Sequence, residues 1–228
     1  MLFDLGGTLV HYFDWEQVPE LLAQGTRQAV DLLQRRGIRR VPREPVSVDV
    51  SVGSRPDDHR VRPLEQRLLA AFGLGNPAAD QGLLDELCRC FVDPVCRLAH
   101  RYDDSVPTLE RLRREGYRLA IVTNTPWSCP ATLWREEIAR QGLGALVDAV
   151  VCCRDVGWCK PAPQVFLHAM EAVAARPEEC LFVGDDLRCD VVGAEAVGID
   201  AVLIDRDGRR PGASARVIHT LDELWQYL

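Results

Sequence analysis

The residues whose chemistry stands out first lie at the start of the chain, directly after a short apolar segment. Asp4 ends this segment, and Gly6 and Gly7 follow it. Glycines at such a point let the backbone approach a ligand closely, and exposed amides after a strand can cradle an anion. The pattern makes Asp4 a candidate nucleophile toward a phosphoryl group. An aspartate in a turn before two glycines is the structural alternative.

Carboxylates also cluster after an apolar segment near the other end of the chain. Asp185 and Asp186 come directly after Gly184, and Asp190 lies a few residues further on. Clustered carboxylates repel one another unless a hard cation joins them, and oxygen ligands with retained waters suit Mg²⁺. This segment is therefore a candidate magnesium site.

Two more places add polar groups of the right kind. Lys160, followed by Pro161, is the only lysine among the 27 lysine and arginine residues. Its ammonium is a compact point charge, whereas a guanidinium is planar and forked, so a lysine kept here indicates a function. Chance survival on a solvated loop is the alternative. Thr123 and Asn124 end another apolar segment, although both residue types also favour strand ends and turns.

Five short apolar segments predict the sheet that must position these residues. They are rich in Val, Ile, Leu and Phe, as suits strands buried on both faces, and helical stretches lie between most of them. This alternation predicts an α/β fold with a doubly wound parallel sheet, whose strand ends bring the polar residues together. The segments are Met1 to Leu5, Arg118 to Thr123, Leu146 to Val151, Cys180 to Gly184 and Ile199 to Ile204.

One connection, between Leu9 and Tyr102, is too long for a loop and predicts a second domain. Apolar residues recur at helical spacing around 15–37, 64–72 and 84–95, and Pro94 is expected to kink or end the last helix. We therefore expect a Rossmann-like core at 1–10 and 101–228 and a smaller, mostly helical cap at 11–100.

Within this insertion, the stretch from Ile38 to Arg62 is rich in Arg, Pro and Asp. Valines alternate with polar residues there, which favours an extended segment or a loop over the site. Its arginines are candidates for binding a second anionic group, with a solvated basic loop as the alternative. The residues concerned are Val46, Val48, Val50 and Val52, and Arg55, Arg60 and Arg62.

Taken together, the motifs resemble those of the haloacid dehalogenase-like (HAD) hydrolase superfamily, with a helical cap inserted after the first motif. The resemblance implies that Asp4 attacks a phosphoryl group in line and forms an aspartyl-phosphate, which water then hydrolyses. It also implies that Lys160 orients Asp4. The matching residues are Asp4 and Thr8, Thr123-Asn124, the run from Val156 to Pro163 and the run from Gly184 to Gly198.

The resemblance further implies a Mg²⁺ ion and a set of phosphoryl-binding groups. Asp4, the backbone carbonyl of Gly6 and Asp185 would hold the ion, which offsets the repulsion between an attacking carboxylate and an anionic substrate. Asp186 or Asp190 would bind the ion directly, bind it through a water molecule, or support one of the residues that bind it. The substrate-binding residues implied are Gly7 through its amide, Thr8, Thr123, Asn124 and Lys160, and the substrate is a small phosphorylated metabolite.

Gly6 is where the chain departs from the phosphatases of this superfamily, which carry there a second aspartate. That aspartate protonates the leaving group and activates water, a function typically worth about 10²–10⁴ in rate. Three explanations are open: a substrate with a good leaving group such as an acyl or aryl phosphate, a substitute acid such as His11 or Asp14, or a catalytically impaired protein that binds a phosphorylated ligand or a partner.

Other chemistries of the superfamily fit the residues less well. Carbon–halogen cleavage needs no metal, so Asp185, Asp186 and Asp190 argue against it. The phosphonate-cleaving branch needs a cap lysine for an imine, and no lysine exists outside position 160. A phosphomutase would need the missing aspartate even more than a hydrolase, because it returns the phosphoryl group to a second hydroxyl.

Composition narrows the setting and the partners. A net charge of −7 argues against nucleic acid or an anionic membrane as a partner, and no apolar run approaches the length of a membrane span. Nine cysteines without a leader-like segment predict a cytoplasmic protein. The sequence leaves open whether it is a monomer or a homodimer. The pattern of Cys88, Cys90, Cys96 and His100 fits no familiar zinc spacing. Three residues before Asp4 make a short first strand, which suggests an upstream start or a loosely held strand end.

Overall fold

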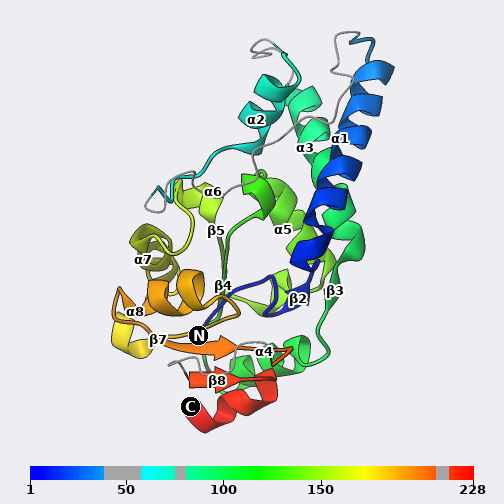
Figure 1. The fold of residues 1–228 in the computed structure, drawn as a ribbon. Helices are drawn as coiled ribbons and strands as arrows, with labels where there is room; N and C mark the ends of the chain where they lie inside the picture. The colour runs from blue at the N-terminus through cyan, green and yellow to red at the C-terminus, as the bar shows by residue number, and fades with distance from the viewer. Residues whose placement is uncertain (39–57, 75–80, 209–215) are drawn as a thin grey trace.

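The computed structural model describes residues 1–38, 58–74, 81–208 and 216–228, and its centre is a parallel sheet (Figure 1). The strand order is β5-β4-β1-β6-β7-β8, with every neighbouring pair parallel. The predicted α/β fold with a doubly wound parallel sheet is therefore confirmed. The strands are β1 (Leu2–Phe3), β4 (Ala120–Thr123), β5 (Ala149–Cys152), β6 (Leu181–Gly184), β7 (Asp200–Ile204) and β8 (Arg216–Ile218).

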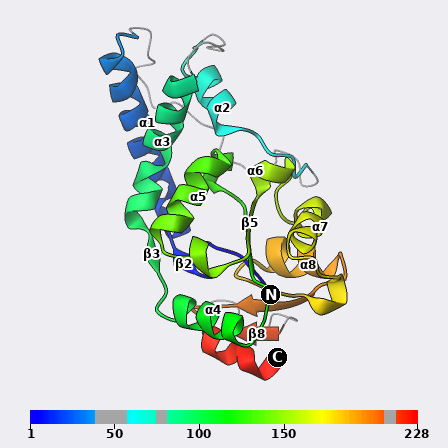
Figure 2. The same cartoon turned by 180° about the vertical axis from the view of Figure 1, so that it is seen from behind.

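Alternating strand residues divide the core into two apolar layers, one on each face of the sheet. Leu2 and Phe182 pack with Val165 and Phe166 of α7. Their neighbours in the strands pack on the other face, against residues of α4 and α5 such as Leu109. Helices on both faces follow from strands whose side chains are apolar on both sides (Figures 1 and 2). The core helices are α4 (Ser105–Arg114), α5 (Ala131–Arg140), α6 (Cys153–Val156), α7 (Pro163–Ala172) and α8 (Gly193–Glu195).

The first strand is short but lies in the middle of the sheet and is held on both sides. Leu2 and Phe3 pair with β4 on one side and with β6 on the other. The amide of Asp4 donates to Val183 O at 2.8 Å. The end of β1 is therefore firmly placed, which matters because the candidate nucleophile follows it.

The long connection after β1 carries the cap helices, which are α1 (Val18–Arg35), α2 (Leu64–Ala71) and α3 (Gln81–Leu98). Their positions confirm the three helices expected from apolar spacing. A two-stranded antiparallel ribbon of β2 (Val10–His11) and β3 (His100–Arg101) joins them to the core. Cap residues such as Leu33 and Phe91 belong to the same apolar cluster as Phe3 and Ile121 of the core. The boundaries of the cap at 11 and 100 stay a prediction.

Three details differ from the sequence prediction or fall outside it. Helix α3 continues past Pro94 to Leu98, so Pro94 does not end the helix, and Phe91 and Val95 on either side of it are completely buried. Strand β8 was not expected, since Arg216–Ile218 is too short for an apolar run. The valines from Val46 to Val52 and Arg55 lie outside the described residues.

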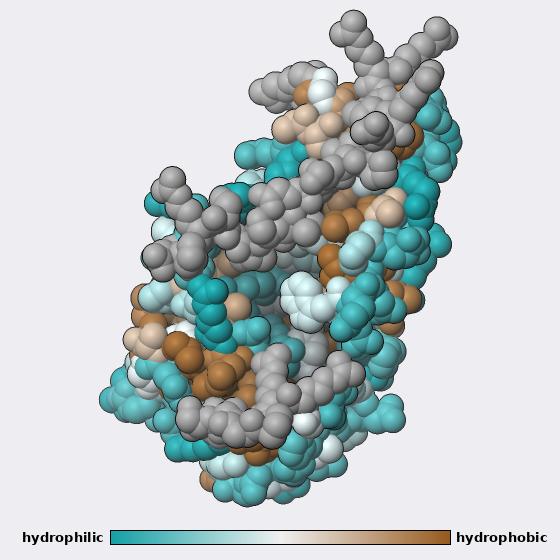
Figure 3. All heavy atoms as spheres, in the orientation of Figure 1, coloured by the Kyte–Doolittle hydropathy of each residue, from teal (hydrophilic) through white to brown (hydrophobic). Residues whose placement is uncertain are grey.

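The face of the molecule seen in Figure 3 is largely hydrophilic and is hollowed between the cap helices and the core. This hollow lies on the side of the sheet toward which the cap helices extend in Figure 1. No helix among the described residues is long and apolar enough to cross a membrane.

Gly25 tests how closely the cap helices α1 and α3 pack. A Cβ at Gly25 would lie 2.4 Å from the carbonyl oxygen of Phe91. Alanine normally stabilises a helix by about 1 kcal/mol over glycine, but overpacking costs about 1–3 kcal/mol. We expect Gly25→Ala to lower the free energy of unfolding in urea, whereas Gln24→Ala stays within about 0.5 kcal/mol of wild type. A more stable Gly25→Ala protein would contradict this close approach.

Candidate active site

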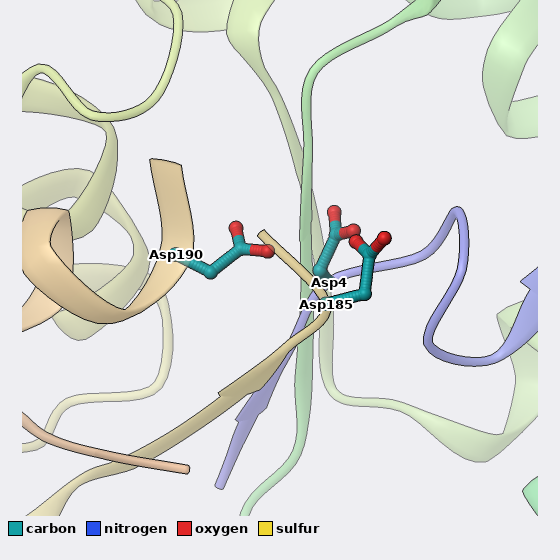
Figure 4. Close-up of side chains that lie close together, drawn as sticks. All are labelled: Asp4, Asp185 and Asp190. Carbon is teal, nitrogen blue, oxygen red and sulfur yellow. The ribbon is translucent and has the colours of Figure 1, made fainter. Parts of the chain in front are cut away.

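Three carboxylates meet at the carboxyl ends of the central strands. Asp4 follows β1, Asp185 follows β6, and Asp190 lies in η5 (Leu187–Val192), a π-helical turn. Each offers an oxygen, and these oxygens all lie within 4.8 Å of one another. Figure 4 shows Asp4 and Asp185 side by side, with Asp190 pointing toward them from its helical turn. The structure thus brings together three of the predicted metal ligands.

The ammonium of Lys160 lies between two of these carboxylates. Its Nζ is 2.5 Å from Asp4 Oδ1 and 2.7 Å from Asp190 Oδ1. The side chains of Lys160 and Asp190 are 3% and 1% exposed, whereas that of Asp4 is 11% exposed. Asp4 is therefore the member of this trio that a ligand can reach.

Burial and charge act against each other in this trio. Burial alone lowers the pKa of Lys160, but the negative charges of Asp190 and Asp4 raise it overall, so the ammonium stays charged. Burial raises the pKa of Asp190 to about 7, even though the charge of Lys160 opposes the rise. An oxygen of Asp185 lies within the same cluster, and three carboxylates so close together favour a bound cation.

The backbone of Lys160 is fixed by Asn124 from the end of the neighbouring strand β4. The amide of Lys160 donates to Asn124 Oδ1 at 2.9 Å, and Asn124 Nδ2 donates to Lys160 O at 3.2 Å. The Lys160–Pro161 peptide bond is cis. Asn124, expected as a substrate-binding residue, thus positions the lysine by bonding both sides of its backbone.

Asp186 points into its own turn, and this separates it from the other acids. Its Oδ1 accepts hydrogen bonds from the amides of Arg188 and Cys189 at 2.9 and 2.7 Å, as an N-cap residue does. Its own amide donates to Asp190 Oδ2 at 3.0 Å. Of the two candidates for the further metal ligand, Asp190 is the one whose carboxylate reaches the cluster.

Two glycines leave room for these carboxylates. A Cβ at Gly7 would lie 2.4 Å from Asp185 Oδ2, and a Cβ at Gly184 would lie 2.3 Å from Asp190 Oδ2. Gly7 also has a φ of +75°, which disfavours other residues. Because neither glycine has a side chain, the carboxylates of Asp185 and Asp190 can occupy these positions. Hard carboxylate oxygens are suited to a small divalent cation.

Three residues that were predicted to bind phosphoryl oxygens, Gly7, Thr8 and Thr123, have other contacts in this structure. The amide of Gly7 donates to Val10 O at 2.9 Å, so it would have to release that bond to bind a phosphoryl oxygen. Thr8 is completely buried, and its carbonyl accepts a hydrogen bond from Arg206 Nη2 at 2.6 Å. Thr123 is at the expected strand end, where its hydroxyl donates to Asn124 O at 3.3 Å.

The surroundings of Gly6 are aromatic. The Cδ2 atom of Tyr12 lies 3.6 Å from the position that a Cβ at Gly6 would take. Tyr12 packs on Trp134 of α5 with ring centroids 4.9 Å apart, and both side chains are buried. Burial raises the pKa of Tyr12, and the negative charge of Glu137 raises it further, so the phenol stays neutral.

His11, a candidate substitute acid, has its described contacts on the ribbon. Its ring lies 4.8 Å from that of His100, and its Nδ1 lies 3.5 Å from the hydroxyl of Tyr102. Among the described residues, His100 and the cysteines of its sequence pattern do not form a group that could hold a metal ion. Cys88 belongs to the apolar core of the cap, where burial raises the pKa of its thiol to about 12.

A segment of the cap connection pairs with the loop that leads to Lys160. The amide of Val61 donates to Gly157 O at 3.0 Å, and the amide of Cys159 donates to His59 O at 2.7 Å. The guanidinium of Arg60 lies over the ring of Trp158, 4.5 Å from its centroid. Arg62, also expected to bind an anion, lies 4.0 Å from Asp58.

The sequence predicted the charged groups of the site, but it did not indicate Tyr12 or the positioning contacts of Asn124. Tyr12 gave no signal, because no local pattern shows that an aromatic residue six positions after Gly6 packs beside it. The two hydrogen bonds between the Asn124 side chain and the Lys160 backbone join residues far apart in the chain, and no local pattern predicts them. A signal did exist for Asp186, since an aspartate just before a helical turn commonly caps it.

A doubly wound sheet with acids at the carboxyl ends of β1 and β6, and helices inserted after β1, defines the class of fold. A model of the haloacid dehalogenase-like hydrolase family matches residues 1–198. The chain belongs to this family of hydrolases, as its motifs predicted.

Individual relatives agree with the family. Phosphatase MT3486 of Mycobacterium tuberculosis is 28% identical over 97% of this chain and 94% of its own. The crystal structure of a HAD phosphatase from Thermococcus onnurineus is 30% identical, with a TM-score of 0.68 over 99% of this chain and 95% of that one. Ribulose-1,5-bisphosphate 5-phosphatase of Halopiger xanaduensis is 37% identical over 45% of this chain, a match that spans only 41% of that relative.

The two glycines after Asp4 should differ in their tolerance of a side chain. Gly7→Ala places a methyl group against Asp185 at a left-handed φ, which costs roughly 1–3 kcal/mol. Gly6→Ala meets only an ordinary contact with Tyr12 and should keep the wild-type stability within about 0.5 kcal/mol. Urea unfolding of both variants measures the difference. Equal stabilities would show that the loop adapts to Gly7→Ala.

Lys160→Met should destabilise the protein by about 3–5 kcal/mol, because it leaves buried carboxylates without their cation. The loss should be larger at pH 8 than at pH 5. Burial raises the pKa of Asp190 in the folded state, so protonation at low pH relieves the uncompensated charge. Chemical unfolding at both pH values tests this, with Arg114→Met on the exposed face of α4 as control. A loss independent of pH would contradict the role given to Asp190.

Proposed function

We propose that this hydrolase is a Mg²⁺-dependent phosphatase that cleaves a phosphate monoester or acyl phosphate through an aspartyl-phosphate on Asp4. The observation that carries the proposal is the geometry of Asp4. Its carboxylate ends the central strand, touches the buried ammonium of Lys160 and is the most exposed group of that trio. Named phosphatases among the relatives support the same reaction class.

In the first step, a carboxylate oxygen of Asp4 forms a bond to phosphorus as the bond to the leaving oxygen breaks. Lys160 holds Asp4 in one orientation and places positive charge next to the phosphoryl oxygens. In the second step, water attacks phosphorus, which releases inorganic phosphate and restores Asp4. Thr123, at the end of β4, is proposed to hold a phosphoryl oxygen.

The cation is assigned to Asp4, the carbonyl of Gly6, Asp185 and Asp190. The arrangement of the three carboxylates supports this set, and the contacts of Asp186 argue for a capping role instead. When bound, Mg²⁺ supplies positive charge that lowers the repulsion between the carboxylate nucleophile and an anionic substrate. The chain itself buries Asp190 and most of Asp4, and it has a glycine at position 7, where a side chain would collide with Asp185.

The substrate is proposed to be a small phosphorylated metabolite. The protein is proposed to work in the cytoplasm, with neither nucleic acid nor a membrane as a partner. The acidic net charge and the nine free cysteines support that setting. The metabolite is bound between the core and the cap, where the hollow in Figure 3 lies.

Asp4→Asn should abolish turnover of p-nitrophenyl phosphate, because a neutral amide is not a nucleophile toward phosphorus. Removal of divalent cations with EDTA should do the same, and Mg²⁺ should restore activity to wild type only. Mg²⁺ should also raise the melting temperature of wild type more than that of Asp185→Asn. Asp31→Asn, on the exposed face of α1, is the matched control. Metal-dependent turnover that survives Asp4→Asn would refute the mechanism, and a folded wild type inactive on all phosphate substrates would favour a binding role.

A further inference from the structure

The space beside Asp4 in which a second carboxylate would stand is open. A Cβ at Gly6 would have one described atom within 4 Å, Tyr12 Cδ2 at 3.6 Å, and the φ of Gly6 lies outside the left-handed region. Neither crowding nor backbone conformation therefore requires a glycine here. Its effect on the site is chemical, since it supplies no proton donor and no base.

The wall of this space is aromatic and buried. Tyr12 and Trp134 are 6% and 2% exposed, and their rings pack against each other. An alkoxide that departs beside such a wall would carry a concentrated negative charge in a poorly solvated place. A delocalised anion suits the same surroundings much better.

The titratable groups that would be substitutes have other positions. His11 contacts His100 and Tyr102 on the ribbon. Asp14 is exposed just before the helical turn η1 (Trp15–Gln17). Asp190 is held by Lys160, and Asp186 caps its own turn. None of these four described residues has an atom within 4 Å of the position that a Cβ at Gly6 would take.

We propose that this enzyme acts on phosphate compounds whose leaving oxygen departs as a weakly basic anion, a carboxylate or a phenolate, without a proton from the protein. The inference rests on the proposed role of Asp4. The bond from Asp4 to phosphorus forms, the bond from phosphorus to the leaving oxygen breaks, and the electron pair stays on that oxygen. Ordinary alkyl phosphates, whose leaving alkoxides need a proton, are poor substrates.

The second half of the reaction lacks a base for the same reason. Water attacks the aspartyl-phosphate without a carboxylate to take its proton, so this step is slow compared with departure of a good leaving group. The first turnover therefore releases close to one equivalent of phenolate per enzyme before the slower steady rate.

The test is a series of aryl phosphates that differ in the basicity of the phenol, from nitrophenol to phenol itself with a pKa of about 10. Acetyl phosphate and glycerol phosphate extend the series to a carboxylate and an alkoxide leaving group. We expect kcat/KM of the wild type to fall steeply as basicity rises, and nitrophenyl phosphate to give a burst. Comparison of acetyl phosphate with nitrophenyl phosphate distinguishes the acyl from the aryl source.

Gly6→Asp restores the missing acid, and Gly6→Asn has nearly the same shape without a proton to give. Gly6→Asp should raise kcat/KM on glycerol phosphate by about 10²–10⁴, flatten the dependence on basicity and remove the burst. Gly6→Asn should show no such gain. Melting temperatures confirm that both variants are folded, and the wild-type series decides the question by itself if they are not.

A wild-type kcat/KM that does not change across the series would overturn the inference. If Asp4→Asn is inactive in that case, the phosphatase proposal stands and another group donates the proton. A dependence that becomes steep only in His11→Ala would identify His11 as that group. Turnover that survives Asp4→Asn would instead remove the proposed function itself.

Discussion

The arrangement of this site depends on the two ion pairs of Lys160, whose ammonium is buried between Asp4 and Asp190. The three charged residues come from the loop after β1, the loop before α7 and the turn η5, so a single charge joins three separate parts of the core. Burying charged groups is costly, and the cost is met only when each group has a close partner. Every other feature of the site serves to place those partners.

Several contacts of the surrounding elements can be understood in this way. Asn124 bonds both sides of the lysine backbone, which fixes where the side chain starts. Asp186 caps η5, and that turn presents Asp190 toward the lysine. Gly184 has no side chain where Asp190 must lie. The acid that remains partly exposed is Asp4, so the same ion pairs that stabilise the fold leave one carboxylate open to a ligand.

The sequence predicted much of this arrangement because its strongest signals are local. Apolar runs that end in Asp4, Thr123 and Asp185 predict both a parallel sheet and the edge at which their polar residues meet. The sequence could not predict the hydrogen bonds between the Asn124 side chain and the Lys160 backbone, because they depend on contacts between distant segments. It also could not show that Tyr12 lies beside Gly6. The burial of Phe91 and Val95 on either side of Pro94, in a helix that does not end there, is equally absent from local patterns.

The cap connection has a mechanical consequence for this centre. His59 and Val61 share main-chain hydrogen bonds with Gly157 and Cys159, and Cys159 is covalently joined to Lys160. The cap is thus attached to the core at the β2–β3 ribbon and again one residue from the ammonium. If the segment from His59 to Val61 moved outward with the cap, this short ladder would break or pull on the residue beside Lys160. Such a movement would therefore change both the access of a ligand to Asp4 and the position of Lys160.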